Sequence, residues 1–367
     1  MDKQTMPVVL IPSLEPDGRL PAYVAELMAA GFDRVVVVND GSGPEYQPIY
    51  DEIEALGVHV LGYPVNKGKG GALKTGLRWI LEHMPDCAGV VTADSDGQHK
   101  TADCLRLAEA MASGGEDALW MGCRDFNLPN IPPKSRFGNK VTSVVFKALY
   151  GVWLPDTQTG LRGFSAKEIP FMAEVEGERY EYEMNVLIAC ARRKLPVKTI
   201  TIETVYENNN EGTHFHPLRD SWRIYKVILG NFFNFMASSL VCFGVDQGLA
   251  ALLREWLLPL LGLAQGSFWN VNISGWGARL VSSVVNFTLN KNLVFRRKGK
   301  AGSAAWKYAV LCVVIICLSN LGVWALGKIG VPLCLAKLIC DGLLYFVSYR
   351  VQQNWVFAEA PAKEEAK

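Results

Sequence analysis

Four long apolar stretches fill the last third of the chain and constrain its architecture more than any other feature. They cover approximately residues 228–253, 269–295, 306–326 and 331–357. Each stretch is long enough to cross ~30 Å of hydrocarbon, which takes ~20 helical residues. The sequence therefore predicts a transmembrane domain of four helices over residues 228–357. A short amphipathic helix or linker at 218–227 is expected before it, either at the membrane interface or packed on the N-terminal domain, and a polar tail at 358–367 after it.

Basic residues between the stretches predict the orientation of this domain. The link after the second stretch is rich in Lys and Arg, with Lys291, Arg296, Arg297, Lys298, Lys300 and Lys307. The other two links carry little positive charge. Because Lys and Arg favour the cytoplasmic side, the middle link is predicted to be cytoplasmic. Four spans then put both termini on that side, as in a multi-pass protein of the cell membrane with a cytoplasmic N-terminal domain.

The apolar region contains an internal sequence repeat and a few charged side chains. The segment 286–295 resembles the segment 348–357, and matching positions are 62 residues apart. This spacing predicts two repeated helical hairpins. Charged side chains inside a span are costly and are functional candidates by default; those found here are Asp246, Arg279, Lys337 and Asp341. The last two are four residues apart and could also simply pair.

Residues 1–217 have a different pattern, in which short apolar runs alternate with segments of helical period. Apolar runs at 8–11, 35–38 and 58–61 are each followed by polar turn residues, and helical spacing appears at 20–30 and 69–81. Such alternation predicts an α/β fold with a mostly parallel sheet. Strands that are apolar throughout indicate a sheet covered on both faces. The formal net charge of +1 argues against a nucleic-acid partner.

Two carboxylates follow one of these apolar runs directly. Asp94 and Asp96 stand one residue apart after the run 90–93. Ligands of open α/β sheets bind at the carboxyl ends of the strands. An Asp-x-Asp pair at that place suits a hard divalent cation, with coordination positions left open for diphosphate oxygens. The sequence therefore predicts a metal site here.

Other strand ends deliver polar residues to the same predicted edge. Glu15 and Asp40 follow the first two strands, and Arg124 ends a later one. Each alone is more often a turn residue or a helix cap, but as a set they indicate a binding site for a base, a ribose and phosphates. The glycine-rich segment 66–71 is a candidate phosphate cradle through its backbone N–H groups. It is not a P-loop, because Gly70 stands where Ser or Thr is required.

These segments, in this order, resemble glycosyltransferase family 2. The group that the chain resembles most is that of dolichol-phosphate mannosyltransferases and polyprenyl-phosphate glycosyltransferases, and the apolar tail resembles the GtrA-like membrane domain. The resemblance rests on residues 11–15, 38–42, 66–71, 94–99, 122–124 and 156–162. It implies a GT-A fold, inversion at the sugar carbon, Mg²⁺ or Mn²⁺, a UDP- or GDP-linked sugar donor and a polyprenyl phosphate acceptor. A homo-oligomer is also expected.

The resemblance also implies roles for individual residues. It assigns the metal to Asp94, Asp96 and Gln98, and the acceptor phosphate to Arg124, Arg136 and Lys140. It assigns the nucleotide sugar to Pro12, Leu14, Glu15, Asp40, Lys67, Gly68, Asp94, Ser95, Asp96 and Arg124. The catalytic set is Asp94, Asp96, Arg124 and Asp156, the last orienting or deprotonating the acceptor.

The chain departs from the family pattern at three places. Residues 13–16 read Ser-Leu-Glu-Pro where Thr-Tyr-Asn-Glu is usual, Lys140 replaces a serine, and Thr159 and Leu161 replace Ser and Phe. The acidic segment 178–183 opens a predicted helix and is either near the acceptor or simply solvated.

Two other functions remain as alternatives. A processive polysaccharide synthase would carry Gln-x-x-Arg-Trp before a span, and the corresponding residues 208–216 lack it. A translocator of lipid-linked sugars would not need the Asp94–Asp96 pair.

Overall fold

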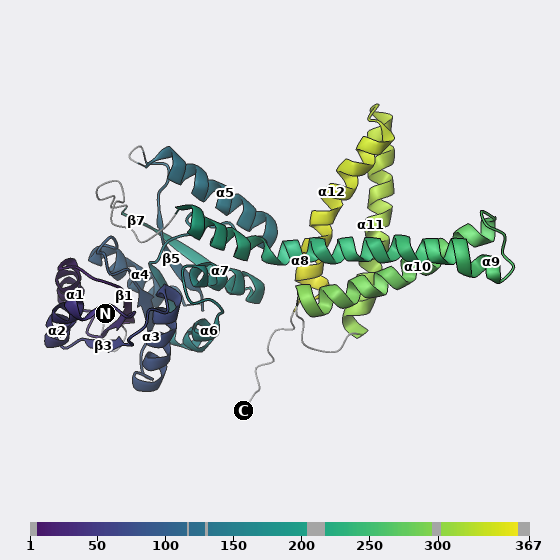
Figure 1. Ribbon diagram of the computed structural model, residues 1–367. Coiled ribbons are helices and arrows are strands. Elements are labelled where there is room, and N and C mark those ends of the chain that lie inside the picture. Colours follow the sequence, from purple (N-terminus) through teal and green to yellow (C-terminus); the bar gives the residue numbers. More distant parts are fainter. Residues whose placement is uncertain (1–5, 116, 129–130, 204–216, 296–301, 359–367) are drawn as a thin grey trace. The chain divides into compact units, whose positions relative to one another are not determined.

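We describe a computed structural model of the chain over residues 6–115, 117–128, 131–203, 217–295 and 302–358 (Figure 1). The chain divides into two compact units, Met1–Ile228 and Leu229–Lys367. Residues 208–216, where a polysaccharide synthase would carry Gln-x-x-Arg-Trp, lie outside the described residues.

The N-terminal unit is built on a seven-stranded sheet with the order β3-β2-β1-β4-β6-β5-β7. All described strand pairs are parallel except those of β6, which runs antiparallel to β4 and β5. The predicted mostly parallel sheet is therefore confirmed. The strands are β1 Val8–Ser13, β2 Val35–Asn39, β3 His59–Gly62, β4 Gly89–Thr92, β5 Leu119–Arg124, β6 Arg162–Ser165 and β7 Val197–Ile202.

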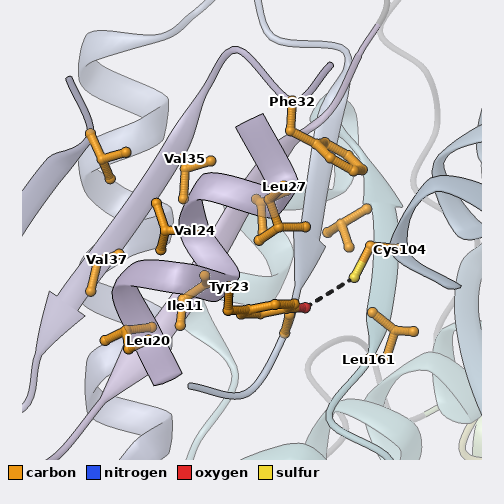
Figure 2. Packing of buried hydrophobic residues seen from close by; sticks show 14 of the residues in the cluster. Ile11, Leu20, Tyr23, Val24, Leu27, Phe32, Val35, Val37, Cys104 and Leu161 are labelled. Atoms are coloured by element: carbon orange, nitrogen blue, oxygen red, sulfur yellow. Dashed lines mark hydrogen bonds between the residues drawn. The ribbon is translucent and has the colours of Figure 1, made fainter. Parts of the chain in front are cut away.

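Helices cover both faces of this sheet, as the apolar strands predict. Successive strand residues point to opposite faces. Val9 and Ile11 pack into a buried cluster with α1 (Arg19–Ala29), α2 (Gln47–Ala55) and α4 (Thr101–Ser113). Figure 2 shows part of this cluster, with Ile11 beside residues of α1 and Cys104 of α4. Leu10, on the opposite face, lies against Gly76 of α3 (Lys69–His83), where an added Cβ would be 2.2 Å from the Leu10 side chain.

The other helices of this unit complete the second face. α3 packs on α6 (Ile169–Glu174) and on α7 (Glu181–Arg193), and α7 contacts α5 (Pro133–Tyr150). Short 3-10 turns lie at Pro44–Tyr46 and Ala166–Glu168. This arrangement leaves the carboxyl ends of β1, β2, β4 and β5 on one edge, together with the start of the reversed strand β6.

The predicted interfacial helix at 218–227 is not a separate element. Helix α8 runs without interruption over Pro217–Leu252. Within the N-terminal unit, the Tyr225 hydroxyl lies 3.1 Å from Thr142 Oγ1, and the Tyr150 hydroxyl donates to the Ile228 carbonyl at 2.9 Å. The first part of α8 is therefore a continuous helix that packs on α5.

The C-terminal unit contains α10 (Phe268–Leu289), α11 (Gly302–Lys328), α12 (Leu333–Val351) and the short α9 (Leu258–Leu260), which follows a π-helical turn at Leu253–Leu257. Two helical segments among the described residues, Ile224–Leu260 and Gly302–Lys328, are long and apolar enough to cross a membrane. The predicted total of four spans stays a prediction.

The structure supports the predicted internal repeat. Helices α10 and α12 both continue into a π-helical turn, Asn290–Val294 and Gln352–Val356. The first residues of the two turns occupy matching positions of the repeat, and Asn290 Nδ2 donates to Gln352 Oε1 at 3.0 Å. The matching segments thus contact one another at the same point of each repeat.

Aromatic rings of the two repeats contact one another reciprocally. Phe287 and Tyr349 occupy matching positions, as do Phe295 and Phe357. Phe295 lies 5.8 Å from Tyr349, and Phe287 lies 5.6 Å from Phe357, between ring centroids. Such tilted aromatic contacts add packing energy to that of the buried area.

The charged residues of the apolar stretches have partners within this unit. Lys337 Nζ lies 2.9 Å from Asp341, so the predicted pairing is confirmed. Arg279 lies 3.6 Å from Asp246, which also accepts a hydrogen bond from Ser282 at 3.0 Å. Pairing lowers the cost of these charges in an apolar surrounding and gives them a structural role.

Candidate active site at the carboxyl edge of the sheet

Asp94 lies directly after β4 and contacts two nitrogen-bearing side chains. Its Oδ1 is 2.6 Å from Lys69 Nζ, and its Oδ2 is 3.1 Å from His99 Nε2. Burial alone would raise the pKa of Asp94, but Lys69 and His99 outweigh it and hold the pKa below its usual range. Asp94 is therefore an anion fixed in place before any ligand arrives.

Lys69, at the start of α3, joins Asp94 to α7. Its Nζ also lies 3.0 Å from Glu183 Oε1. Burial opposes the charged form, but the two carboxylates prevail and raise the pKa of Lys69 above its usual value, so it remains a cation. The sequence pattern assigns no role to Lys69 or His99. The only signal was their place inside the glycine-rich and Asp-x-Asp segments.

Asp96 has the opposite electrostatic environment. Burial and the charge of Asp94 raise its pKa, while its Oδ1 accepts a hydrogen bond from the Gln98 backbone N–H at 3.0 Å. Two neighbouring carboxylates that repel one another are well suited to a divalent cation. The described residues contain no cluster of three or more His, Cys, Asp or Glu side chains that could hold a metal ion. The metal site predicted at Asp94, Asp96 and Gln98 therefore stays a prediction, in which diphosphate and water would supply the remaining ligands.

Asp40, at the end of β2, is buried and supports the glycine-rich segment. Its carboxylate accepts hydrogen bonds from the Tyr63 hydroxyl at 2.6 Å and from the backbone N–H groups of Lys67 at 2.9 Å and Gly68 at 2.9 and 3.1 Å. In this structure its oxygens thus hold the protein backbone. The predicted contact of Asp40 with the nucleoside stays a prediction.

The glycines of this segment allow α3 to approach the start of α7. Gly68 has φ +95°, and a Cβ there would lie 2.6 Å from Arg179 Cγ. The Gly71 N–H donates to the Glu178 carbonyl at 2.8 Å. The backbone amides of Lys67, Gly68 and Gly71 are therefore already used by protein acceptors. The prediction that the remaining amides of 66–71 cradle a phosphate stays a prediction.

The end of β1 and the loop after it carry three of the residues predicted to hold the nucleoside. Pro12 is buried in the strand, Leu14 is half-buried and Glu15 is exposed. Glu15 has a left-handed backbone with φ +48°, and its N–H donates to Ser42 Oγ at 2.9 Å. This bond ties the ends of β1 and β2 together at the site edge.

Arg124 and Asp156 form a bidentate ion pair at the end of β5. Arg124 Nε donates to Asp156 Oδ2 at 2.7 Å, and Nη2 donates to Oδ1 at 3.1 Å. Asp156 is fully buried and also accepts from the Gln158 N–H at 3.0 Å. Both oxygens thus hold the guanidinium in a fixed orientation. This geometry supports a positioning role for Asp156 more than that of a free base.

The segment 156–162 connects this pair to Asp94. Thr92 Oγ1 donates to the Gly160 carbonyl at 2.8 Å, and a Cβ on Gly160 would lie 2.5 Å from Asp94 Oδ2. One short segment therefore contacts Arg124 at one end and Asp94 at the other. The structure brings these two predicted catalytic residues to the same edge.

Arg162 secures the end of this segment. Its side chain is buried, its Nε donates to the Thr159 carbonyl at 3.0 Å, and its Nη1 donates to the Glu183 carbonyl at 2.6 Å. Arg162 belongs to the segment 156–162, but the sequence alone gives it no role.

Helix α5 carries the residues predicted to bind the acceptor phosphate. Arg136 and Lys140 are exposed and one helical turn apart, so they share a face of the helix. Arg136 Nη2 donates to the Leu128 carbonyl at 2.9 Å. Buried Asn139 accepts from the Thr157 N–H at 3.2 Å and so anchors α5 to the segment that carries Asp156.

Comparison with known families assigns both units. Residues 9–165 match the family described as glycosyl transferase family 2, and residues 234–357 match the family described as GtrA/DPMS, transmembrane domain. The matched ranges contain Asp94, Asp96, Arg124 and Asp156. The protein is therefore a glycosyltransferase.

More particularly, the chain joins a family 2 glycosyltransferase domain to a GtrA/DPMS transmembrane domain. An uncharacterised protein, MJ1222 of Methanocaldococcus jannaschii, is 28% identical over 61% of this chain and 92% of its own length. The UDP-N-acetylglucosamine–dolichyl-phosphate N-acetylglucosaminyltransferase of Methanococcus voltae is 28% identical over 54% of this chain and 85% of its own length. The undecaprenyl-phosphate mannosyltransferase of Micrococcus luteus is 26% identical over 50% of this chain and 77% of its own length.

Solved structures show a weaker likeness. A glucosyl-3-phosphoglycerate synthase from Mycobacterium tuberculosis, in complex with Mg²⁺ and UDP, gives a TM-score of 0.46 at 17% identity over 61% of this chain and 79% of its own. The assignment rests on the sequence families.

Proposed function

We propose that this enzyme transfers a sugar from a nucleotide diphosphate sugar to a membrane polyprenyl phosphate, with inversion at the sugar carbon. The observation that carries the proposal is the joint placement of Asp94, Asp96 and the Arg124–Asp156 pair on one sheet edge. This site belongs to a chain that continues into a GtrA/DPMS transmembrane domain. The named relatives from M. voltae and M. luteus act on dolichyl phosphate and undecaprenyl phosphate, which supports a lipid phosphate acceptor.

The chemistry requires little acid–base help from the protein. A phosphate monoester has its second pKa near ~6, so it is already a nucleophile at neutral pH. This agrees with an Asp156 whose two carboxylate oxygens both hold the Arg124 guanidinium. The enzyme's task is then to orient two phosphate-bearing substrates and to stabilise the leaving diphosphate.

Charged side chains of the site supply this stabilisation. Arg124 offers a fixed guanidinium that can bind phosphate oxygens, and Asp156 prevents it from turning away. Mg²⁺ or Mn²⁺ held by Asp94, Asp96 and Gln98 would add charge neutralisation for the diphosphate. On α5, Arg136 and Lys140 present two positive charges for the acceptor phosphate.

The purified full chain tests this proposal directly. It should convert undecaprenyl or dolichyl phosphate to a sugar-phosphate lipid with UDP- or GDP-linked sugars, and mass spectrometry would identify the product. The same polyprenol without its phosphate should not react. Titration with UDP and with GDP, with and without Mn²⁺, identifies the nucleotide. Equal reaction of the alcohol, or hydrolysis of the donor without lipid product, would refute the assigned acceptor.

Arg136→Ala is expected to raise the KM for lipid phosphate about tenfold or more, with the KM for the nucleotide sugar changed less than twofold. A charge-assisted contact to phosphate contributes ~1.5–3 kcal/mol, which corresponds to this change. Steady-state kinetics with each substrate varied in turn measures both constants. Arg34→Ala, which removes an arginine paired with the exposed carboxylate of Asp86, is a suitable control for the loss of a surface arginine. A rise confined to the KM of the nucleotide sugar would contradict the acceptor role.

We also propose that the glycosyltransferase domain and both termini lie in the cytoplasm and that the protein crosses the membrane four times. A cysteine at Gly299, with exposed Cys317 and Cys334 replaced by serine, should resist a membrane-impermeant thiol reagent in intact cells and react in inverted vesicles. The basic residues around 296–300 favour this side, each contributing ~1 kcal/mol near anionic lipid. Labelling of intact cells would contradict the orientation.

A further inference from the structure

Lys69 lies between two carboxylates at the proposed metal site. Its Nζ is 2.6 Å from Asp94 Oδ1 and 3.0 Å from Glu183 Oε1. The side chain of Lys69 is 19% exposed and that of Glu183 is 12% exposed, so neither charge is fully solvated. The transfer mechanism has given no role to either residue.

The acidic side chains of this cluster outnumber the basic one. By formal charge, Asp94, Asp96 and Glu183 contribute three negative charges and Lys69 contributes one positive charge, so these four side chains carry a net charge of −2. A divalent cation would complete this balance. It would, however, share Asp94 with an ammonium group that already contacts it, and the two cations would repel one another.

Glu183 keeps Lys69 in place from the other side. The Glu183 main chain is held by buried Arg162, which donates to its carbonyl at 2.6 Å, and the residue lies in the first turn of α7. A cation arriving at Asp94 therefore does not free Lys69 from the site. Both cations would remain close together and would need further negative charge, which the diphosphate of the donor carries.

We propose that Lys69 is a resident counter-ion of the metal site, a positioning residue that neutralises Asp94 in the empty enzyme and weakens divalent metal binding until the nucleotide diphosphate is present. The proposal rests on the metal site of the proposed function. If Lys69 has this role, metal and nucleotide bind cooperatively, and each increases the affinity of the site for the other by the same factor.

Mn²⁺ binding to the full chain in detergent, followed by electron paramagnetic resonance with and without UDP or GDP, tests this role without any turnover. In the wild type, nucleotide should tighten Mn²⁺ binding. Lys69→Met should bind Mn²⁺ roughly tenfold tighter without nucleotide, because the repelling charge is gone, and nucleotide should add correspondingly less. Lys69→Arg, which keeps the charge, should resemble the wild type. Lys74→Met is the matched control, because Lys74 of the same helix pairs with Glu178 and not with Asp94.

Glu183→Gln gives an independent second readout. It leaves Lys69 with Asp94 alone and should weaken Mn²⁺ binding several-fold, the opposite direction from Lys69→Met. Unchanged or weaker Mn²⁺ binding in folded Lys69→Met, with folding verified by its melting temperature, would overturn the proposal. If Lys69→Met does not fold, unchanged or tighter binding in Glu183→Gln would overturn it.

Asp96→Asn separates this inference from the proposed function. Loss of Mn²⁺ binding in Asp96→Asn supports the metal site, so an overturning result at Lys69 would then refute the counter-ion role alone. Wild-type Mn²⁺ binding in Asp96→Asn would refute the metal site itself and the counter-ion role with it.

Discussion

Asp96→Asn is expected to lower the turnover of sugar transfer by 10²–10³-fold or more, while the protein remains folded. The substitution keeps the shape of the side chain but removes one of two carboxylates that together suit a divalent cation. Loss of one group that stabilises developing charge in an active site typically has an effect of about this size. Turnover at saturating donor and lipid phosphate, over a range of Mg²⁺ and Mn²⁺, measures it.

Asp86→Asn is the matched control for this variant. Asp86 precedes the same strand, is exposed and pairs with Arg34 on the surface, where an ion pair has little effect on stability. Its turnover should equal that of the wild type. Undiminished turnover of Asp96→Asn at saturating metal would remove Asp96 from the metal site.

Arg124→Met is expected to abolish transfer and also to destabilise the domain by about 2–3 kcal/mol. The variant leaves the fully buried Asp156 carboxylate without its cation, and an unpaired buried charge is costly. We expect a destabilisation near the lower end of what is usual when a buried ion pair loses one partner, because the Arg124 side chain is 29% exposed. A lowered melting temperature and a loss of product are the two measurements.

The double variant Arg124→Met/Asp156→Asn distinguishes chemistry from stability. It removes the unpaired charge together with its partner, so the melting temperature should return most of the way to the wild-type value. Activity should not return, because the guanidinium is still missing. Recovery of activity in the double variant would show that Arg124 only balances the charge of Asp156. A melting temperature that stays low would show that the cost in Arg124→Met is not electrostatic.

Much of the N-terminal fold could be predicted from local patterns. Apolar runs such as 8–11 and 35–38 became the parallel strands β1 and β2, because a run without polar alternation fits only a sheet covered on both faces. The direction of β6 could not be predicted. A run of four residues, Arg162–Ser165, looks the same whether it pairs parallel or antiparallel.

In the apolar tail, too, some features could be predicted from the sequence and others could not. Its hydrophobic length and its repeat at 286–295 and 348–357 were legible in the sequence, and the hydrogen bond between Asn290 and Gln352 shows that the matching segments contact one another. The helical link predicted at 218–227 proved to be the beginning of α8, because no local signal separated it from the apolar stretch that follows.

For the active site, the sequence by itself determined which residue types arrive at the sheet edge. Asp94, Asp96 and Arg124 follow apolar runs, and a parallel sheet brings the carboxyl ends of its strands together. Only the tertiary structure decided the partners of these groups. Lys69 contacts Asp94, 25 residues away in the sequence, and Glu183, 114 residues away. Arg124 contacts Asp156, 32 residues away. Contacts between residues so distant along the chain depend on how helices pack on the sheet, and packing leaves no periodic signature in the local sequence.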